Sequence, residues 1–253
     1  EIDRAVSERL RSGSSLYMVD EELLRRLVPD LIVTQDLCQV CAPSGNEAAQ
    51  AIQALEHTPM VLYLTPKSLR DIFDNILEVG EAAGKPGQAR RLVTGLEERV
   101  ACMRERTAGL RERPRVFIFE WFDPPYCAGH WMAELTQLAG GEDQLAARGK
   151  DSVRVPWERI KAAAPEVLVL APCGYRLDAV LREAERLRQF PGWDDLPAVR
   201  NHRVYAVDAS SYFARPGPRV VAGMEMLAEI FHPQLFHNLA PPRSYQKLEA
   251  VKV

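Results

Sequence analysis

The stretch VPWERIKAAAPEVLVLA, residues 155–171, contains the pattern that decides the fold. A short amphipathic helix is followed by Pro165 and then by an apolar run. Proline disfavours helix in the residue before it and cannot lie inside a helix, so the helix must end there. The run at 167–171 has the length and the β-branched content of a buried parallel strand.

Residues 19–35, VDEELLRRLVPDLIVTQ, repeat this pattern earlier in the chain. Pro29 matches Pro165, and Leu24 matches Ile160. The copies lie about 136 residues apart, which is much longer than the period of about 20–50 residues in solenoid arrays. We therefore expect two similar lobes with a cleft between them.

The composition excludes several classes of protein. A chain of 253 residues with a formal charge of −3 has no basic surface of the kind that binds nucleic acid. The longest apolar runs, such as 60–64, are far shorter than the roughly 20 residues that span a bilayer. Five cysteines, an odd number, argue against a disulfide-stapled fold. Because the chain opens at Glu1 without a methionine, we expect upstream sequence to have been removed.

The order of predicted elements indicates an α/β fold: two lobes, each a mostly parallel sheet flanked by helices, joined by one long bridging helix. Residues 1–87 form the N-terminal lobe. It is expected to be incomplete, lacking an N-terminal strand, because clear strands occur only at 31–35 and 60–65. Residues 88–113 form the bridging helix, nearly 40 Å long at about 1.5 Å per residue. Residues 114–253 form the C-terminal lobe.

The C-terminal lobe is expected to contain strands and helices in alternation. The predicted elements are strands at 115–121, 167–171 and 204–208, and helices at 130–138, 177–189 and 218–231. In parallel sheets, ligands bind where the loops after the strands converge. Those loops, at 35–41, 120–131, 172–175 and 208–215, are rich in tryptophan, tyrosine and cysteine. We interpret these aromatic residues as a wall for a large, flat or apolar ligand, the alternative being that they cover the sheet ends.

Three further motifs carry weaker signals. Cys38-x-x-Cys41 lacks the second Cys/His pair that a zinc site needs, so we favour a tight loop near the cleft over a redox or metal role. His130 could be a lower ligand to the metal of a macrocycle or a hydrogen-bond donor to an anionic group. We favour a third interpretation, a helix-start histidine bonded to a loop carbonyl. Glu120, Asp123 and His130 suggest a general-base cluster, but no catalytic motif supports it, and we predict that the chain is not an enzyme.

Several stretches resemble one family. The matching segments are PDLIV (29–33), RVFIFEWFDPPYCAG (115–129), AGGE (139–142), SVRVPW (152–157), APEVLV (164–169) and YFARPGPR (212–219). Together they resemble the helix-bridged class of ABC-transporter substrate-binding proteins, and within it most closely the vitamin B12 (cobalamin)-binding proteins. The resemblance implies a binding protein without a cofactor, which delivers a corrinoid or another large metal chelate to an ABC permease. It meets the membrane only through that permease, on the periplasmic or extracellular side.

The resemblance also implies roles for residues. Trp121, Tyr126 and Tyr212 would contact the corrin, and the loop at 36–41 would close over it from the other lobe. With the remaining loop residues, the predicted ligand contacts are Gln35, Asp36, Cys38, Trp121, Asp123, Tyr126, His130, Tyr175, Tyr212 and Arg215. The predicted permease-docking carboxylates are Glu47 in the first lobe and Asp178 or Glu183 in the second.

Three alternatives stay open at the level of sequence. In the first, the protein is still a binding protein, but its ligand is haem or a ferric siderophore instead of a corrinoid. An arginine cluster in the cleft would favour a siderophore, yet only Arg215 and Arg176 are placed to contribute to one. A chelatase-like tetrapyrrole enzyme would use His130 with Glu120. A cytosolic corrinoid-handling protein would explain the free cysteines.

Overall fold

The computed structural model describes residues 19–35, 51–53 and 55–248, and these form two compact units. The first unit contains the described residues up to Pro66 together with Asp74–Ala89. The second contains Lys67–Phe73 and the described residues from Arg90 onward.

The first unit is built around the first copy of the repeated pattern. Helix α2 (Glu21–Leu27) is capped by Asp20, whose side chain accepts a hydrogen bond of 2.9 Å from the Leu23 N–H. Strand β1 (Leu31–Thr34) pairs in parallel with β2 (Met60–Tyr63). Both predicted strands are therefore present, although each ends one or two residues earlier than expected.

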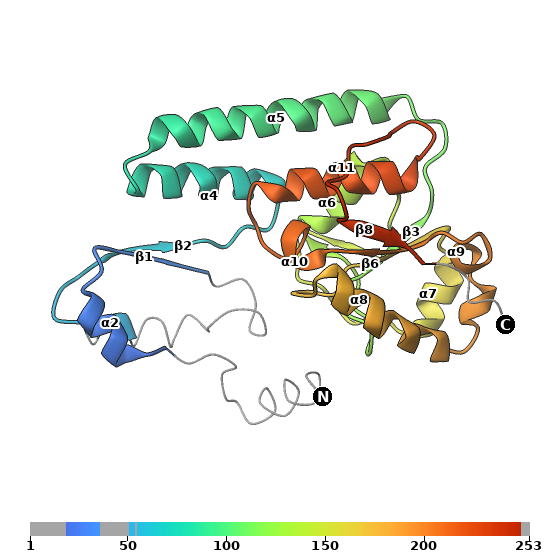
Figure 1. Ribbon diagram of the computed structural model, residues 1–253, viewed down its shortest axis with the longest axis horizontal. Coiled ribbons are helices and arrows are strands. Elements are labelled where there is room, and N and C mark those ends of the chain that lie inside the picture. Colours follow the sequence, from blue (N-terminus) through green and yellow to red (C-terminus); the bar gives the residue numbers. More distant parts are fainter. Residues whose placement is uncertain (1–18, 36–50, 54, 249–253) are drawn as a thin grey trace. The chain divides into compact units, whose positions relative to one another are not determined.

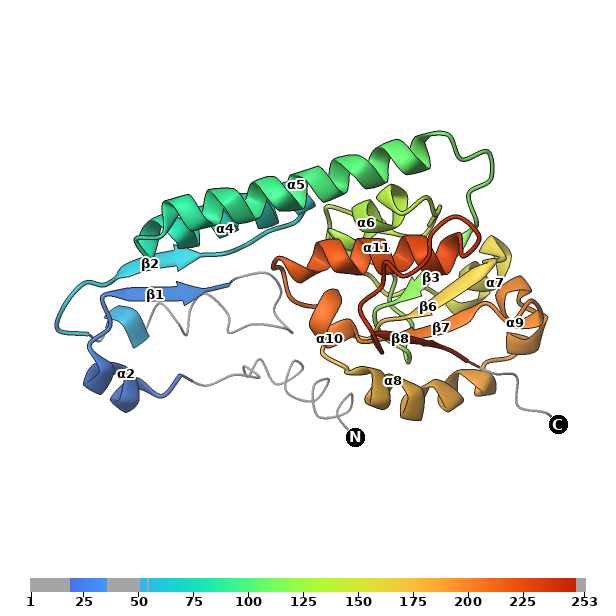
Figure 2. The same ribbon diagram turned by 45° about the horizontal axis from the view of Figure 1, so that its top comes forward.

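The second unit contains a sheet of four strands in the order β3-β6-β7-β8. Its members are β3 (Val116–Phe119), β6 (Val167–Leu170), β7 (Val204–Val207) and β8 (Tyr245–Lys247). The first three are parallel and entirely buried, whereas β8 is an antiparallel edge strand that the sequence reading missed. Helices α6 (Met132–Leu138) and α11 (Arg219–Phe231) lie on one side of the sheet, and α8 (Leu177–Ala184) lies on the other (Figures 1 and 2). The predicted α/β class with mostly parallel sheets is confirmed.

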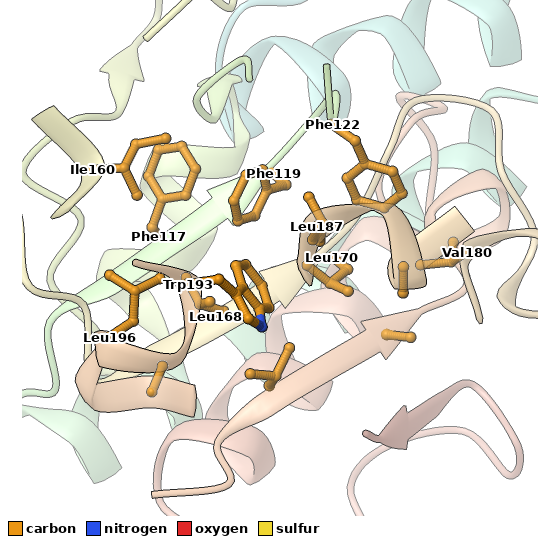
Figure 3. Close-up of a cluster of buried hydrophobic side chains, with 14 of the residues drawn as sticks. Phe117, Phe119, Phe122, Ile160, Leu168, Leu170, Val180, Leu187, Trp193 and Leu196 are labelled. Carbon is orange, nitrogen blue, oxygen red and sulfur yellow. The ribbon is translucent and has the colours of Figure 1, made fainter. Parts of the chain in front are cut away.

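Alternate residues of the buried strands form the main core cluster (Figure 3). Phe117 and Phe119 of β3 pack edge to face, with ring centroids 4.7 Å apart. From the helical segments, fully buried side chains such as Ile160 and Leu187 complete this cluster. Because every residue of β3, β6 and β7 is buried, the ends of these strands are the places left for polar and functional loops.

The remaining elements are short except for two. They are α4 (Leu69–Ala82), α5 (Pro86–Ala108), β4 (Gly129–His130), β5 (Ala147–Arg148), α7 (Trp157–Ala163), η1 (Glu185–Gln189), η2 (Trp193–Asp195), α9 (Pro197–Arg200) and α10 (Ala209–Tyr212). Helix α5 ends five residues before residue 113, the predicted end of the bridging helix, and Gly109 follows its last turn. The predicted helix at 177–189 is divided, because α8 tightens into the 3-10 turn η1 after Ala184. Among the described residues, no helix has both the length and the apolar character needed to cross a membrane.

The second copy of the pattern, α7 and β6, has the same backbone form as the first. The residue before the proline adopts a left-handed conformation in both copies, with φ 45° at Val28 and φ 44° at Ala164. This single residue ends the helix and turns the chain into the strand. The repeat seen in the sequence is therefore a repeat of local structure.

Candidate ligand-binding site

The loops that follow the buried parallel strands carry most of the predicted ligand residues. Trp121, Asp123 and Tyr126 follow β3, and Tyr175 follows β6. Tyr212 ends α10, which follows β7. Because β3, β6 and β7 are parallel, these loops leave the same edge of the sheet.

The loop after β3 folds back on itself. The Glu120 N–H donates to the Tyr126 carbonyl at 3.0 Å, and the Tyr126 N–H donates to the Trp121 carbonyl at 3.2 Å. The peptide bond between Asp123 and Pro124 at the tip of this loop is cis. The two hydrogen bonds hold Trp121 and Tyr126 opposite each other as an antiparallel bridge.

The three loops are joined to one another by backbone hydrogen bonds. The Cys173 N–H donates to the Glu120 carbonyl at 3.1 Å, which joins the β3 and β6 loops. The Ser210 N–H donates to the Tyr175 carbonyl at 2.9 Å, which joins the β6 loop to α10. As a result, the rings of Trp121 and Tyr175 meet edge to face, with centroids 5.7 Å apart and an interplanar angle of 78°. The structure therefore brings these two predicted residues together.

Helix α10 presents the remaining loop residues. Asp208 caps it by accepting a hydrogen bond of 3.0 Å from the Ser211 N–H. Tyr212 in its last turn is half-buried, and Arg215 beyond it is exposed. Both residues therefore follow β7 on a segment that Ser210 ties to the β6 loop.

Buried acidic groups lie close to the aromatic loop. The Glu120 carboxylate accepts hydrogen bonds from the Gly129 N–H, at 3.0 Å, and from the Ser152 hydroxyl. Burial raises its pKa, and these hydrogen bonds and the neighbouring His130 offset only part of that effect. Burial also raises the pKa of Asp143 to about 6, although the Leu145 N–H donates to its carboxylate. Burial likewise raises the pKa of the Cys127 thiol, so this cysteine is held as a neutral thiol.

His130 does not begin a helix, contrary to our expectation. It lies in β4 with φ 48°, its N–H donates to the Lys150 carbonyl at 2.7 Å, and α6 begins only at Met132. Its Nε2 lies 3.2 Å from an Asp151 carboxylate oxygen without hydrogen-bond alignment. The ring also contacts Trp131, at a centroid distance of 5.6 Å. Its described partners therefore do not join His130 to the Trp121–Tyr175 pair.

Other predicted residues fall elsewhere in the chain. Gln35 is half-buried and follows β1 in the first unit, whereas Asp36, Cys38, Cys41 and Glu47 lie outside the described residues. Asp178 and Glu183 lie on α8, where Arg182 and Arg186 pair with them at 2.7 Å each. Their roles in docking stay predictions. Within the described ranges, no group of three or more His, Cys, Asp or Glu side chains is arranged to hold a metal ion.

Two residues of this region were not predicted as site residues. Glu120 was considered only as a general base, yet both of its carboxylate oxygens are engaged by Gly129 and Ser152. Ser152 is 32 positions away in the sequence, and no local pattern connects it to Glu120. The one sequence signal for Ser152 is that it begins the SVRVPW segment, which is among the segments that resemble the family.

Comparison with known proteins places the chain in a family. The model of the family described as periplasmic binding protein matches residues 17–210. An uncharacterized ABC transporter substrate-binding lipoprotein, YvrC of Bacillus subtilis, is 28% identical over 86% of this chain and 67% of its own length. The vitamin B12-binding protein of Vibrio parahaemolyticus is 24% identical over 88% of this chain and 75% of its own length.

A solved structure shows the same fold. The periplasmic heme binding protein from Pseudomonas aeruginosa superposes with a TM-score of 0.71 at 20% identity, covering 86% of this chain and 77% of that one. These proteins bind solutes and are not enzymes, and binding proteins of the family carry no cofactor. The chain that carries the loops after β3, β6 and β7 thus belongs to the periplasmic binding protein family.

Proposed function

We propose that this chain binds a large, flat metal chelate, with a corrinoid such as cobalamin as the favoured ligand. The observation that carries the proposal is the Trp121–Tyr175 pair, fixed at the ends of two adjacent parallel strands. Aromatic side chains offer a large apolar contact area at little conformational cost, and their polar edges still accept or donate hydrogen bonds. A corrin or porphyrin ring has the flat apolar faces that such a wall suits.

The chain is the substrate-binding component of an ABC transporter, and its relatives are periplasmic or lipoprotein binding proteins, so it acts outside the cytoplasm. It performs no covalent chemistry. Its affinity comes from burial of the ligand against loops that are already joined by backbone hydrogen bonds. Preformed loops reduce the ordering cost of binding.

Two observations favour a corrinoid over the alternatives. The relative named as a vitamin B12-binding protein is 24% identical over 88% of this chain, whereas the high-affinity heme uptake system protein IsdE of Staphylococcus aureus is 19% identical over 65% of it. In the loops after β3, β6 and β7, the cations are few: Arg176 and Arg215, both exposed. An anionic siderophore would be expected to need a denser group of arginines.

Haem is the second candidate, and one observation favours it. Tyr126, Tyr175 and Tyr212 all lie on the loops after the parallel strands. A tyrosine oxygen is an established protein ligand of haem iron. Binding of haemin in preference to cobalamin would therefore keep the site and change the ligand.

Titration calorimetry with cyanocobalamin, haemin and a ferric hydroxamate tests the proposal. We expect one-to-one binding of cyanocobalamin at sub-micromolar Kd. Trp121→Ala and Tyr175→Ala should each weaken binding by about tenfold, since an aromatic contact contributes about 1 kcal/mol beyond its area. The matched control is Trp157→Ala, which removes a partly exposed tryptophan packed on Phe190 before β6. Absence of binding to all three probes would overturn the proposed function.

We further propose that α8 contributes to permease docking. Asp178 is exposed, and both it and Glu183 pair with arginines of their own helical segment, which leaves them able to exchange partners. Asp178→Arg with Glu183→Arg should weaken binding to the permease in a pull-down with the ligand Kd unchanged. Glu185→Arg, an exposed carboxylate in the next turn, is the control. Equal loss in the control would contradict a specific role.

A further inference from the structure

Glu120 makes four hydrogen bonds to four different segments. Its N–H donates to Tyr126 at the end of its own loop, and its carbonyl accepts from Cys173 in the loop after β6. One carboxylate oxygen accepts from Gly129 at the start of β4, and the other accepts from the Ser152 hydroxyl. The residue next to Glu120 is Trp121, and the residue two beyond Cys173 is Tyr175. Glu120 therefore links the two segments that carry the aromatic pair.

The approach of Ser152 to Glu120 depends on a glycine. A Cβ atom placed on Gly129 would lie 2.4 Å from the Ser152 backbone nitrogen and 2.9 Å from the Lys150 carbonyl oxygen. Because both of these neighbours are backbone atoms, no side-chain rotation would relieve the contact. Gly129 thus allows two chain segments to pass closely enough for one carboxylate to bind both.

The segment that carries Ser152 is itself fixed to the aromatic loop. The Cys127 N–H donates to the Val153 carbonyl at 3.0 Å, and the Val155 N–H donates to the Pro125 carbonyl at 2.8 Å. These bonds flank Tyr126, which lies opposite Arg154. Ser152 is therefore a fixed point, and a hydrogen bond from it to Glu120 restrains the base of the loop.

We propose that Glu120 is a positioning residue that holds Trp121 and Tyr175 in the single arrangement needed for ligand binding. This inference rests on the proposed function of that aromatic pair. Glu120 does not touch the ligand in this proposal and acts only through the loops. Its carboxylate is suited to that role, because each oxygen accepts a hydrogen bond from a different segment of the chain, one from Gly129 and the other from Ser152.

Substitutions of Glu120 test the proposal through the ligand Kd. Glu120→Ala removes both side-chain hydrogen bonds and should weaken binding of cyanocobalamin by about tenfold. Glu120→Gln should restore binding to within about threefold, because its carbonyl accepts from Gly129 and its amide donates to the Ser152 oxygen. Ser152→Ala, a milder variant in case Glu120→Ala fails to fold, should weaken binding by about threefold. Leu196→Ala, which opens a cavity in the core away from these loops, should lower Tm without changing Kd.

A double-mutant cycle separates positioning from general stability. If Glu120 acts through Tyr175, Glu120→Ala should weaken binding much less in a Tyr175→Ala background than in the wild type. Fully additive losses, or an unchanged Kd in Glu120→Ala, would overturn the inference.

The ligand-free protein gives an independent test. The near-ultraviolet circular dichroism of Trp121, isolated by subtracting the spectrum of Trp121→Phe, should be lost in Glu120→Ala and kept in Glu120→Gln. Loss of this signal in a protein that binds none of the three probes would support positioning while overturning the proposed function. A signal retained in Glu120→Ala would overturn positioning whatever the ligand.

Discussion

The two copies of the helix–proline–strand pattern share a backbone but differ in how well they are buried. In the second copy, every residue of β6 is buried, and Ile160 of α7 is fully buried. In the first copy, no residue of β1 is fully buried, and α2 buries none of its side chains. The same local sequence signal thus produces the same turn in two very different environments.

The difference follows from the neighbours of each strand. Strand β6 lies between β3 and β7 and is covered by helices on both faces. Among the described residues, β1 pairs with β2 alone, and Leu27, Val28 and Val33 are between 48% and 64% exposed. Propensity and capping therefore decide where a helix ends, whereas burial decides how much each side chain contributes to stability.

Matched truncations of the two strands should give the largest difference. Leu168→Ala in β6 should lower the free energy of unfolding by about 3–4 kcal/mol, because it leaves a cavity beneath a fully buried side chain. Ile32→Ala, at the equivalent position of β1, should cost about 1–2 kcal/mol, because Ile32 is only half-buried. Urea unfolding with hydrogen exchange on each strand measures both losses.

Hydrogen exchange also shows whether the two units unfold together, with equal opening free energies for β1 and β6, or separately, with different ones. Tyr63→Ala, which truncates an exposed side chain of β2, is the control for loss of surface area alone. Equal losses for Leu168→Ala and Ile32→Ala would show that β1 is as well packed as β6 and would break the comparison.

Much of the fold could be predicted because its elements carry local signals. Pro29 and Pro165 each mark the end of a helix, and an apolar run such as 167–171 is typical of a buried strand. Strand β8 was missed because Tyr245–Lys247 is short and contains no apolar run, and its pairing with β7 is a long-range contact. His130 was misplaced because its N–H is taken by Lys150, 20 positions later, which no helical pattern reveals.

The candidate site also has a part that the sequence predicts and a part that it does not. The aromatic residues could be predicted because they follow recognisable strands, and Trp121 and Tyr175 do meet. The contacts that hold them could not, because Glu120 and Ser152 come together only when two distant segments pass at Gly129. Sequence therefore identifies the side chains available for binding, and tertiary packing determines which of them are fixed.

Charge also distinguishes the two units. Among the described residues, the resolved pKa shifts all belong to the second unit, and that of Asp143 is large. Its carboxyl holds a proton up to about pH 6 in the folded chain but only to about pH 3.8 when unfolded. The stability that it contributes is therefore complete below pH 3.8 and is lost as the pH rises through 6, by at most about 3 kcal/mol.

Asp143→Asn tests this pH dependence. Asparagine keeps a carbonyl oxygen for the Leu145 N–H but cannot ionise, so the variant should be more stable than the wild type at pH 7 and should lose part of the pH dependence between pH 4 and 7. Urea unfolding across this range measures both effects. His232, whose lowered pKa acts in the opposite direction, is present in both proteins and cancels. Glu120, whose raised pKa acts in the same direction, interacts with the Asp143 carboxylate, so loss of that repulsion is part of the measured difference. The control is Asp194→Asn, an exposed carboxylate, and an identical response in both variants would contradict the role of burial.

The smallest expected effect tests what the two copies share. Val28 and Ala164 both adopt φ near 45°, a conformation that costs a β-branched residue more than alanine and costs glycine least. Val28→Gly should therefore stabilise the chain by about 1 kcal/mol, because little burial is lost from a side chain that is 58% exposed. Ala164→Gly should gain less than about 0.5 kcal/mol, because glycine also increases the entropy of the unfolded chain.

The control for these glycines is Val33→Gly, which places glycine in the extended backbone of β1. Here the expected sign reverses, and stability should fall by about 1 kcal/mol, because valine already fits the strand and glycine only adds freedom to the unfolded chain. Urea unfolding of the three variants gives the order directly. If Val28→Gly lowered stability as much as Val33→Gly does, the left-handed residue before the proline would not be a strained turn. The likeness of the two copies would then lie in their sequences and not in a shared conformational restraint.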